Sequence, residues 1–246
     1  MNDQNRIPAG QWDTVATADG PMRVYTARPA GPADRAVVVL QEAFGVNDHI
    51  QAVARRLAEH GYLALAPDLF HRSGTSELAY SEHAQGMQLI GALGPEQITT
   101  DVHAVLDHLV AAEHIPADST ALTGFCFGGR AAFTAATATS GLAGVVVFYG
   151  PGIAAGPHAV LDQAGAIDAP VLIHVGAQDP TIPADQVAAI DKKLTAAGVA
   201  FEQHVYPGAG HAFACDARPD KYCPAPAETA WARTFAFLDT HLPPTA

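Results

Sequence analysis

The sequence predicts an α/β fold built on one mostly parallel sheet with helices on both faces. Three observations lead to this fold class. Short apolar runs alternate with longer amphipathic stretches, as in strands joined by helical crossovers. The apolar runs lack alternating polar positions, which indicates strands buried on both faces. Two alternating segments around Asp19-Gly20 at the start of the chain are typical of an antiparallel hairpin.

The expected elements follow in chain order. The hairpin strands are expected at residues 12–18 and 22–28, and the later strands at residues 36–40, 62–66, 120–123, 144–148, 170–175 and 201–206. Helical spacing of apolar residues occurs at residues 48–60, 95–113, 128–139, 183–197 and 225–241. Residues 70–94 have weak periodicity, so we expect an excursion over the sheet that can roof a site. Residues 1–246 are expected to form a single domain.

Composition narrows the functional classes. The 246 residues carry a formal net charge of −12 and no Lys/Arg cluster, which disfavours nucleic-acid binding. No apolar run reaches membrane-spanning length, and residues 1–10 lack the apolar core of a signal peptide, so we expect a cytoplasmic protein without a membrane partner. Three cysteines do not make a disulfide framework. We expect no cofactor and no metal.

The first chemical signal is the segment TALTGFCFGGR, residues 120–130. It predicts a nucleophile elbow, a sharp turn from strand to helix with Cys126 in the place of serine. Such a turn needs small residues two before and two after the nucleophile, here Gly124 and Gly128. The helix N-terminus beneath the sulfur favours the thiolate. A lone G-x-C-x-G pattern is about as compatible with an ordinary turn around a buried cysteine.

Two further loops complete a triad in the order nucleophile, acid, base. Asp179 follows the apolar strand at residues 170–175, and His211 lies in a glycine-rich loop after the last strand. Taken alone, Asp179 fits a turn or helix cap and His211 one of many surface histidines. The other helical histidines, such as His49, fit helix surfaces or ends. The chain order favours the catalytic interpretation.

Over essentially its whole length the chain resembles the dienelactone hydrolase family, the carboxymethylenebutenolidases and their relatives. Four motifs carry the resemblance, namely QEAFG at residues 41–45, PDLF at 67–70, GFCFGG at 124–129 and GAGHAF at 208–213. The resemblance implies an α/β-hydrolase fold and hydrolysis of a small ester or lactone. It also implies that Glu42 holds the resting thiol of Cys126 until substrate turns the sulfur towards His211.

The implied cycle has the thiolate attack the carbonyl carbon while the N–H groups of Ala43 and Phe127 bind the oxyanion. Asp179 orients His211, which assists water attack on the thioester. A carboxylate beside a thiolate is a like-charge pair, so Glu42 and Cys126 are expected to share a proton and protect the sulfur from oxidation.

The chain departs from the family at the substrate. The best-known members bind a carboxylate-bearing dienelactone with two arginines, whereas Cys215 stands where one of these is expected. Arg72 and Arg218 are the nearby candidates for a carboxylate clamp, and without either the enzyme is expected to prefer neutral esters or lactones. The candidate substrate-binding residues are Phe44, Arg72, Tyr80, Tyr149, Phe213 and Arg218.

Other interpretations remain open at the level of sequence. A general carboxylesterase or thioesterase of the same fold has the same triad and differs in pocket shape. A ligand-binding protein without turnover, or a redox sensor that pairs Cys126 with Cys215, belongs to a different class. Cys215 and Cys223 are compatible with incidental thiols, a disulfide or a metal site with His204 or His211. The expected assembly is a monomer or small homo-oligomer.

Overall fold

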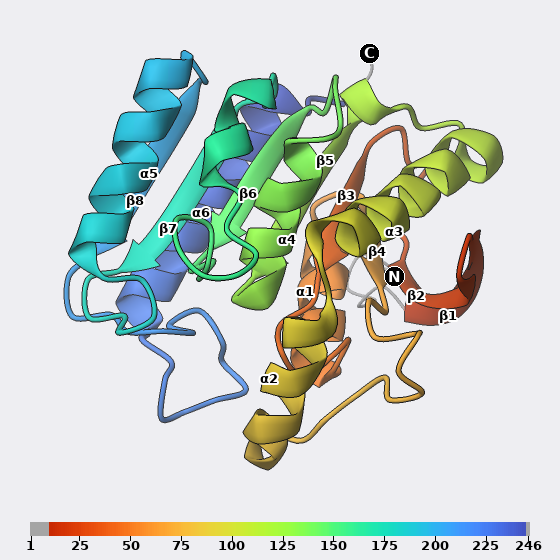
Figure 1. The fold of residues 1–246 in the computed structure, drawn as a ribbon. Coiled ribbons are helices and arrows are strands. Elements are labelled where there is room, and N and C mark those ends of the chain that lie inside the picture. The colour runs from red at the N-terminus through yellow and green to blue at the C-terminus, as the bar shows by residue number, and fades with distance from the viewer. Residues whose placement is uncertain (1–9, 245–246) are drawn as a thin grey trace, which may run out of the picture.

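The computed structural model describes residues 10–244, and its strands form one eight-stranded sheet in the order β1-β2-β4-β3-β5-β6-β7-β8 (Figure 1). The strands are β1 Gly10–Thr17, β2 Gly20–Ala27, β3 Ala36–Leu40, β4 Leu63–Pro67, β5 Thr120–Phe125, β6 Gly144–Phe148, β7 Val171–Gly176 and β8 Phe201–Tyr206. Strand β2 is antiparallel to β1 and to β4, and the remaining pairs are parallel. The predicted hairpin and mostly parallel sheet are confirmed.

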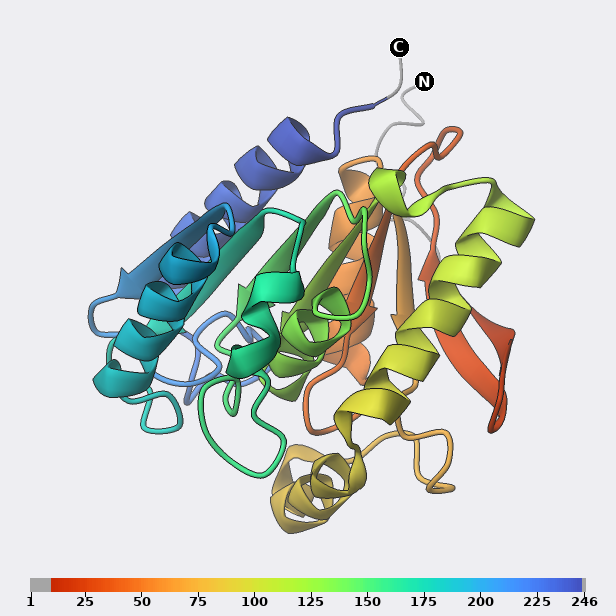
Figure 2. The ribbon, with the colours of Figure 1, turned by 45° about the horizontal axis from the view of Figure 1, so that its top comes forward.

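Six α-helices accompany the sheet in the part of the chain that is described. They are α1 Asp48–Glu59, α2 His83–Ala92, α3 Pro95–His108, α4 Phe127–Ala136, α5 Ala184–Ala197 and α6 Pro224–His241. Helices α3, α4 and α5 lie on one face of the sheet and α1 and α6 on the other (Figures 1 and 2). Strands β3 to β7 are buried along their whole length, as their continuous apolar sequences require. Between residues 10 and 244 no helix combines the length and apolar character needed to cross a bilayer.

The structure differs from the expected elements in two places. The helix expected at residues 95–113 ends as α3 at His108, and a π-helical turn, Leu109–Glu113, continues to His114 in the left-handed conformation. Residues 70–94 contain α2, in which Gly86 and Ile90 are the only buried residues. Because so few of its positions face the interior, its sequence carries little apolar periodicity, and the helix was not predicted.

The parallel strands bring distant segments of the chain to one edge of the sheet. The carboxyl ends of β3, β5, β7 and β8 point the same way, towards the lower edge in Figure 1, and α2 projects from that edge. Gly86 of α2 lies against Ala43, because a Cβ on Gly86 would stand 2.5 Å from the carbonyl oxygen of Ala43. Helix α2 therefore packs on the loop that follows β3.

A buried ion pair anchors the connection between β4 and α2. Asp101 of α3 is fully buried and accepts two hydrogen bonds from the Arg72 guanidinium, at 2.7 and 2.8 Å. His71 lies 3.2 Å from the same carboxylate, and the third Arg72 nitrogen donates to Asp19 at 2.7 Å. All three nitrogens of Arg72 are thus bound to carboxylates, and the Asp101 carboxylate raises the pKa of Arg72.

Replacement of Arg72 is therefore expected to affect stability first. Arg72→Met leaves the Asp101 carboxylate buried without its bidentate partner, so the free energy of unfolding should fall by about 3 kcal/mol or more. Urea unfolding followed by circular dichroism measures the loss. Arg28→Met is the control, because Arg28 pairs with Glu113 at the surface and its loss should cost under about 1 kcal/mol. Equal losses in the two variants would contradict this role of Arg72.

Candidate active site

The turn after β5 holds Cys126 in a backbone conformation that is rare outside glycine. Its φ is 54° and its ψ is −119°. A Cβ on Gly124 would collide with the carbonyl of Gly128, and a Cβ on Gly128 would collide with the carbonyl of Leu40 at the end of β3. The predicted glycines are therefore required by backbone packing at this turn. The Cys126 N–H donates to the carbonyl of Phe148 at 3.0 Å, which ties the turn to β6.

Cys126, His211 and Asp179 form one chain of hydrogen bonds. His211 Nε2 lies 3.0 Å from Cys126 Sγ, and His211 Nδ1 lies 2.7 Å from Asp179 Oδ2. The Asp179 carboxylate is fully buried, His211 is slightly exposed, and Cys126 is partly exposed at the end of the chain. A substrate can therefore reach the sulfur while the carboxylate stays shielded from water.

The charges along this chain stabilise one another. Burial disfavours the imidazolium, but the negative charge on Cys126 and the hydrogen bond to Asp179 outweigh it and raise the pKa of His211 to about 10. Burial likewise opposes ionisation of Asp179, and the bonds from His211 and Thr181 overcome it and lower the Asp179 pKa. Such an arrangement supports a thiolate and imidazolium pair, with the sulfur as nucleophile and His211 as proton donor.

Thr181 is a member of the site that the sequence analysis missed. Its hydroxyl donates to Asp179 Oδ1 at 2.6 Å and its N–H donates to the same oxygen at 2.8 Å. His211 binds the other carboxylate oxygen, Oδ2, so both oxygens of Asp179 have hydrogen-bond partners. The signal was available in principle, because a Thr two residues after an Asp in a turn is typical of local capping.

The two backbone N–H groups expected to bind an oxyanion, those of Ala43 and Phe127, lie on the loop after β3 and at the start of α4. Phe127 is the first residue of α4, so its N–H has no carbonyl to bond within the helix. Ala43 follows β3 on the neighbouring loop, and the register of β3 with β5 puts Leu40 beside Gly124. Within residues 10–244, neither N–H donates to a protein acceptor. Both donors are thus available to an oxyanion.

Glu42 lies in a second hydrogen-bonded network beside this chain. Its side chain is almost fully buried, and Asn47 Nδ2 donates to its carboxylate at 3.0 Å and to the Tyr80 hydroxyl at 3.3 Å. The Tyr80 hydroxyl also contacts Glu42 and lies 3.4 Å from Cys215 Sγ. Burial and the charge of Glu42 raise the pKa of Tyr80, so it remains a neutral donor.

His49 extends the same network and is buried, which corrects its expected place on a helix surface. Its Nδ1 lies 3.2 Å from Asp216, and its ring also contacts Cys215. Burial disfavours a charged His49, but the bonds to Asp216 and Cys215 outweigh it and raise its pKa to about 10. The position was misjudged because His49 stands in the first turn of α1, where a loop distant in sequence, residues 212–216, covers it.

Tyr149 lies where the two networks meet. It is fully buried with a φ of 38°, and its ring packs against His211 at a centroid distance of 5.3 Å. Burial and the charges of Cys215, Glu42 and Cys126 raise its pKa. Its hydroxyl has no partner in the described part of the chain. In this arrangement the sulfur of Cys126 faces His211, and no hydrogen bond joins it to Glu42 within residues 10–244.

The candidate substrate-binding residues fall into separate groups. Arg218 lies over the rings of Tyr80 and Phe44, 5.0 and 5.7 Å from their centroids, and no carboxylate pairs with it within the described residues. Phe213 packs on Tyr149 beside His211. Arg72 does not join them, because its nitrogens are bound to Asp101 and Asp19.

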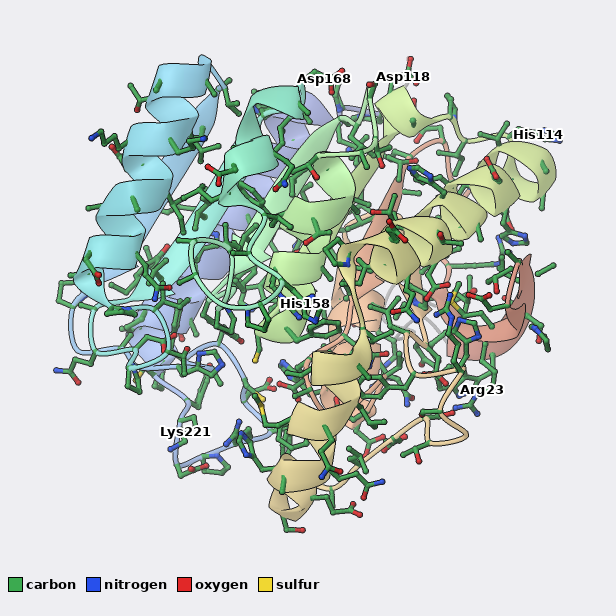
Figure 3. All side chains as sticks on the ribbon, viewed as in Figure 1. Arg23, His114, Asp118, His158, Asp168 and Lys221 are labelled. Atoms are coloured by element: carbon green, nitrogen blue, oxygen red, sulfur yellow. The ribbon has the colours of Figure 1, made fainter. Side chains whose placement is uncertain are left out.

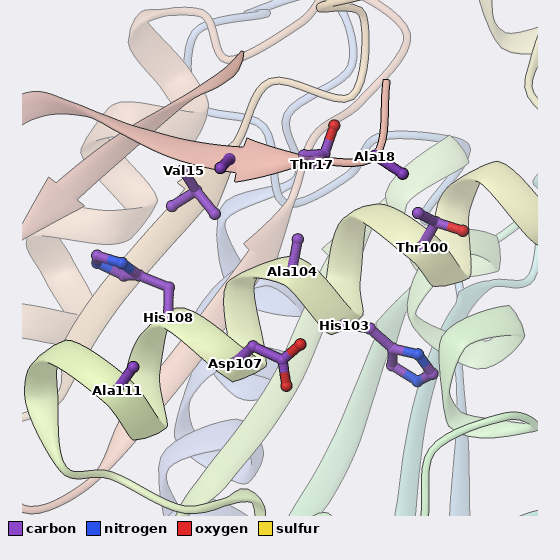
Figure 4. Close-up of a pocket in the computed structure, with 10 residues that line it drawn as sticks. Val15, Thr17, Ala18, Thr100, His103, Ala104, Asp107, His108 and Ala111 are labelled. Atoms are coloured by element: carbon purple, nitrogen blue, oxygen red, sulfur yellow. The ribbon is translucent and has the colours of Figure 1, made fainter. Parts of the chain in front are cut away.

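One cavity lies away from these residues. It measures about 640 Å³ and is lined by residues of β1 and α3 together with Ala18 and Ala111, none of which belongs to either network (Figure 4). Within residues 10–244 no group of three or more His, Cys, Asp or Glu side chains has the arrangement of a metal site. Cys126, Cys215 and Cys223 are free thiols, so no disulfide joins them.

Comparisons with known proteins find relatives that match most of the chain. A family model described as the dienelactone hydrolase family matches residues 22–242. A Yersinia pestis protein given the provisional name carboxymethylenebutenolidase is 35% identical over 238 residues, covering 93% of this chain and 87% of that protein. A protein of Escherichia coli K12 with the same provisional name is 38% identical over 222 residues, covering 86% and 80%.

Solved structures show the same relationship. A protein of Klebsiella pneumoniae, provisionally titled a dienelactone hydrolase, superposes with a TM-score of 0.84 at 32% identity and covers 94% of this chain and 98% of its own. A metagenomic protein titled a dienelactone hydrolase-like promiscuous phosphotriesterase gives a TM-score of 0.80 at 25% identity and covers 95% and 99%. The fold, the matched length and these identities establish that the chain is a hydrolase belonging to the dienelactone hydrolase family.

Proposed function

We propose that this hydrolase cleaves small esters or lactones through a thioester on Cys126. The observation that carries the proposal is the continuous hydrogen-bond chain from the partly exposed Cys126 Sγ through His211 to the buried Asp179. The two free N–H groups of Ala43 and Phe127 support it, because acyl transfer needs donors for the developing oxyanion. Family membership supports hydrolysis as the reaction class.

The proposed cycle balances its protons through His211. The Cys126 thiolate attacks the carbonyl carbon, and the tetrahedral intermediate collapses with cleavage of the bond to the leaving oxygen, which takes the proton from His211 Nε2. Neutral His211 then removes a proton from water as the water attacks the thioester. Cleavage of the C–S bond releases the carboxylic acid and restores the thiolate and imidazolium pair.

The substrate class follows from the groups around the sulfur. Tyr149 packs against His211, and Phe213 packs against Tyr149, so buried aromatic rings lie behind the imidazole. Aromatic surroundings of this kind suit a compact, partly apolar ester or lactone. A relative from Bradyrhizobium, 32% identical over 240 residues, carries the provisional name 2-oxo-3-(5-oxofuran-2-ylidene)propanoate lactonase, which supports a lactone among the candidate substrates.

Removal of the sulfur tests the nucleophile. Cys126→Ala should lower kcat for p-nitrophenyl acetate by more than about 10³-fold while the circular dichroism spectrum is unchanged. Cys223→Ala is the matched control, because Cys223 is partly exposed and lies outside both networks. Mass spectrometry of the rapidly quenched wild type should find an acyl group on Cys126. Turnover that survives in a folded Cys126→Ala variant would overturn the assignment.

The pH dependence tests the roles of His211 and Asp179. The raised pKa keeps His211 protonated below about pH 10, so kcat/KM should fall as the pH rises through about 10. Asp179→Asn removes charge that stabilises the imidazolium, so this alkaline limb should move to lower pH. Hydrolysis by Cys126→Ala provides the blank at each pH.

The control for this profile is Asp162→Asn, which removes an exposed carboxylate paired with Lys193. Its alkaline limb should coincide with that of the wild type. A limb that stays in place in Asp179→Asn would contradict the proposed coupling between Asp179 and His211.

We propose further that Glu42 restrains the resting nucleophile. Glu42 and Cys126 both act electrostatically on the buried Tyr149, so the two groups lie near one another, and a charge on the Glu42 carboxylate disfavours a second negative charge on the sulfur. Glu42→Gln should therefore speed alkylation of Cys126 by iodoacetamide several-fold in the absence of substrate. Glu59→Gln, at the exposed end of α1, is the control. An unchanged or slower alkylation in Glu42→Gln would refute this role.

A further inference from the structure

Arg130 is a buried cation without a polar side-chain partner among residues 10–244. The residue is only 8% exposed, and no hydrogen bond or ion pair joins its guanidinium to an acceptor in this part of the chain. Its contact is the ring of Phe127, whose centroid lies 5.3 Å from the guanidinium carbon. Burial lowers the pKa of Arg130, and attraction to Cys126 opposes this. Arginines buried in proteins are normally paired, as Arg72 is here, so the lack of an acidic partner for Arg130 within the described residues requires an explanation.

The position of Arg130 is fixed relative to the nucleophile. It lies one helical turn beyond Cys126 in α4, and its N–H donates to the Cys126 carbonyl at 3.4 Å. Gly152, with a φ of 81°, makes room for the side chain, because a Cβ there would stand 3.3 Å from Arg130 Cδ. The loop after β6 is thus shaped around the arginine.

Arg130 lines a cavity of about 230 Å³. Phe127 of α4 and Met87 and Ile90 of α2 also line it, together with Pro151, Gly152, Pro157 and His158 of the loop after β6. His158 lies between α4 and α2 and contacts the carbonyl of Gly91 at 3.1 Å (Figure 3). Since a water molecule takes about 30 Å³, the cavity holds a group of several heavy atoms.

The walls of this cavity are mostly apolar, and Arg130 is the only cationic guanidinium that lines it within the described residues. Phe127 connects the cavity to the proposed oxyanion site, because the residue lines the cavity and its N–H directly follows Cys126 in the chain. Cys126 lies close enough to Arg130 for their charges to attract, as is required if one short substrate is to reach both groups. Arginine recognises a carboxylate through two parallel hydrogen bonds.

We propose that Arg130 is a specificity-determining residue that binds a carboxylate of the substrate in this cavity. The inference rests on the proposed ester or lactone hydrolysis at Cys126. The anion is then bound by α4, which begins beside Cys126, and by the loop after β6. Arg72, bound to Asp101, and Arg218, stacked on Tyr80, come from other segments. The cavity size limits the ligand to a short dicarboxylic half-ester or a small carboxylated lactone.

Two esters of equal chain length test the proposal. Mono-p-nitrophenyl glutarate carries the carboxylate, and p-nitrophenyl pentanoate has a methyl group in its place. The ratio of kcat/KM for the anionic ester to that for the neutral ester should fall about 10- to 100-fold in Arg130→Met, because one charged hydrogen-bonded contact is lost. Arg130→Lys should recover part of the ratio, because it keeps the charge without the bidentate geometry.

The matched control is Arg28→Met, which removes an arginine paired with Glu113 and should leave the ratio unchanged. Thermal unfolding of each variant confirms that it is folded. An unchanged ratio in folded Arg130→Met would overturn the proposal, and so would equal losses on both esters, which would indicate a merely structural role.

A binding measurement separates this inference from the proposed function. Glutarate binding to Cys126→Ala is measured by calorimetry, with and without Arg130→Met, and needs no turnover. Binding that is lost with Arg130→Met supports the anion site even if neither ester is hydrolysed, in which case only the proposed function fails. Glutarate affinity that is equal in the two proteins, or absent from both, would overturn the role of Arg130.

Discussion

The site depends on one backbone turn, the one that carries Cys126 between β5 and α4. Its positive φ is possible because Gly124 and Gly128 let the backbone of the turn approach itself and the end of β3. The turn fixes the sulfur at the carboxyl edge of the sheet and leaves the first N–H of α4 free. Asp179 and His211 then need only short loops after β7 and β8, because these strands end at the same edge.

Two hydrogen-bonded networks lie around the sulfur, and in each of them an aspartate holds a histidine beside a cysteine. In one, Asp179 holds His211 beside the partly exposed Cys126. In the other, Asp216 holds His49 beside the buried Cys215, and Tyr80 carries the network on to Glu42. Both histidines have raised pKa values of about 10, so each network contains a cation that offsets its carboxylates. This balance allows Glu42 to remain buried near the nucleophile.

The arginines of the chain show how strongly partners decide the role of a side chain. Arg72 binds Asp101 of α3 and so holds the connection between β4 and α2 against that helix. Arg218 lies on aromatic rings at the edge of the site. Arg130 has no carboxylate partner within the described residues and lines a cavity beside α2. These differences arise from burial and geometry, because the three side chains have the same chemistry.

The sequence by itself determined the alternation of strands and helices, the glycines of the turn, and the order of Cys126, Asp179 and His211. These features are local: apolar runs, turn residues and motif spacing act over a few positions. Tertiary structure decided the burial of His49, the support of Asp179 by Thr181, the pairing of Arg72 and the open cavity beside Arg130. Each of these depends on which distant segments pack together, and a side chain's charge and partners are fixed only once that packing excludes water.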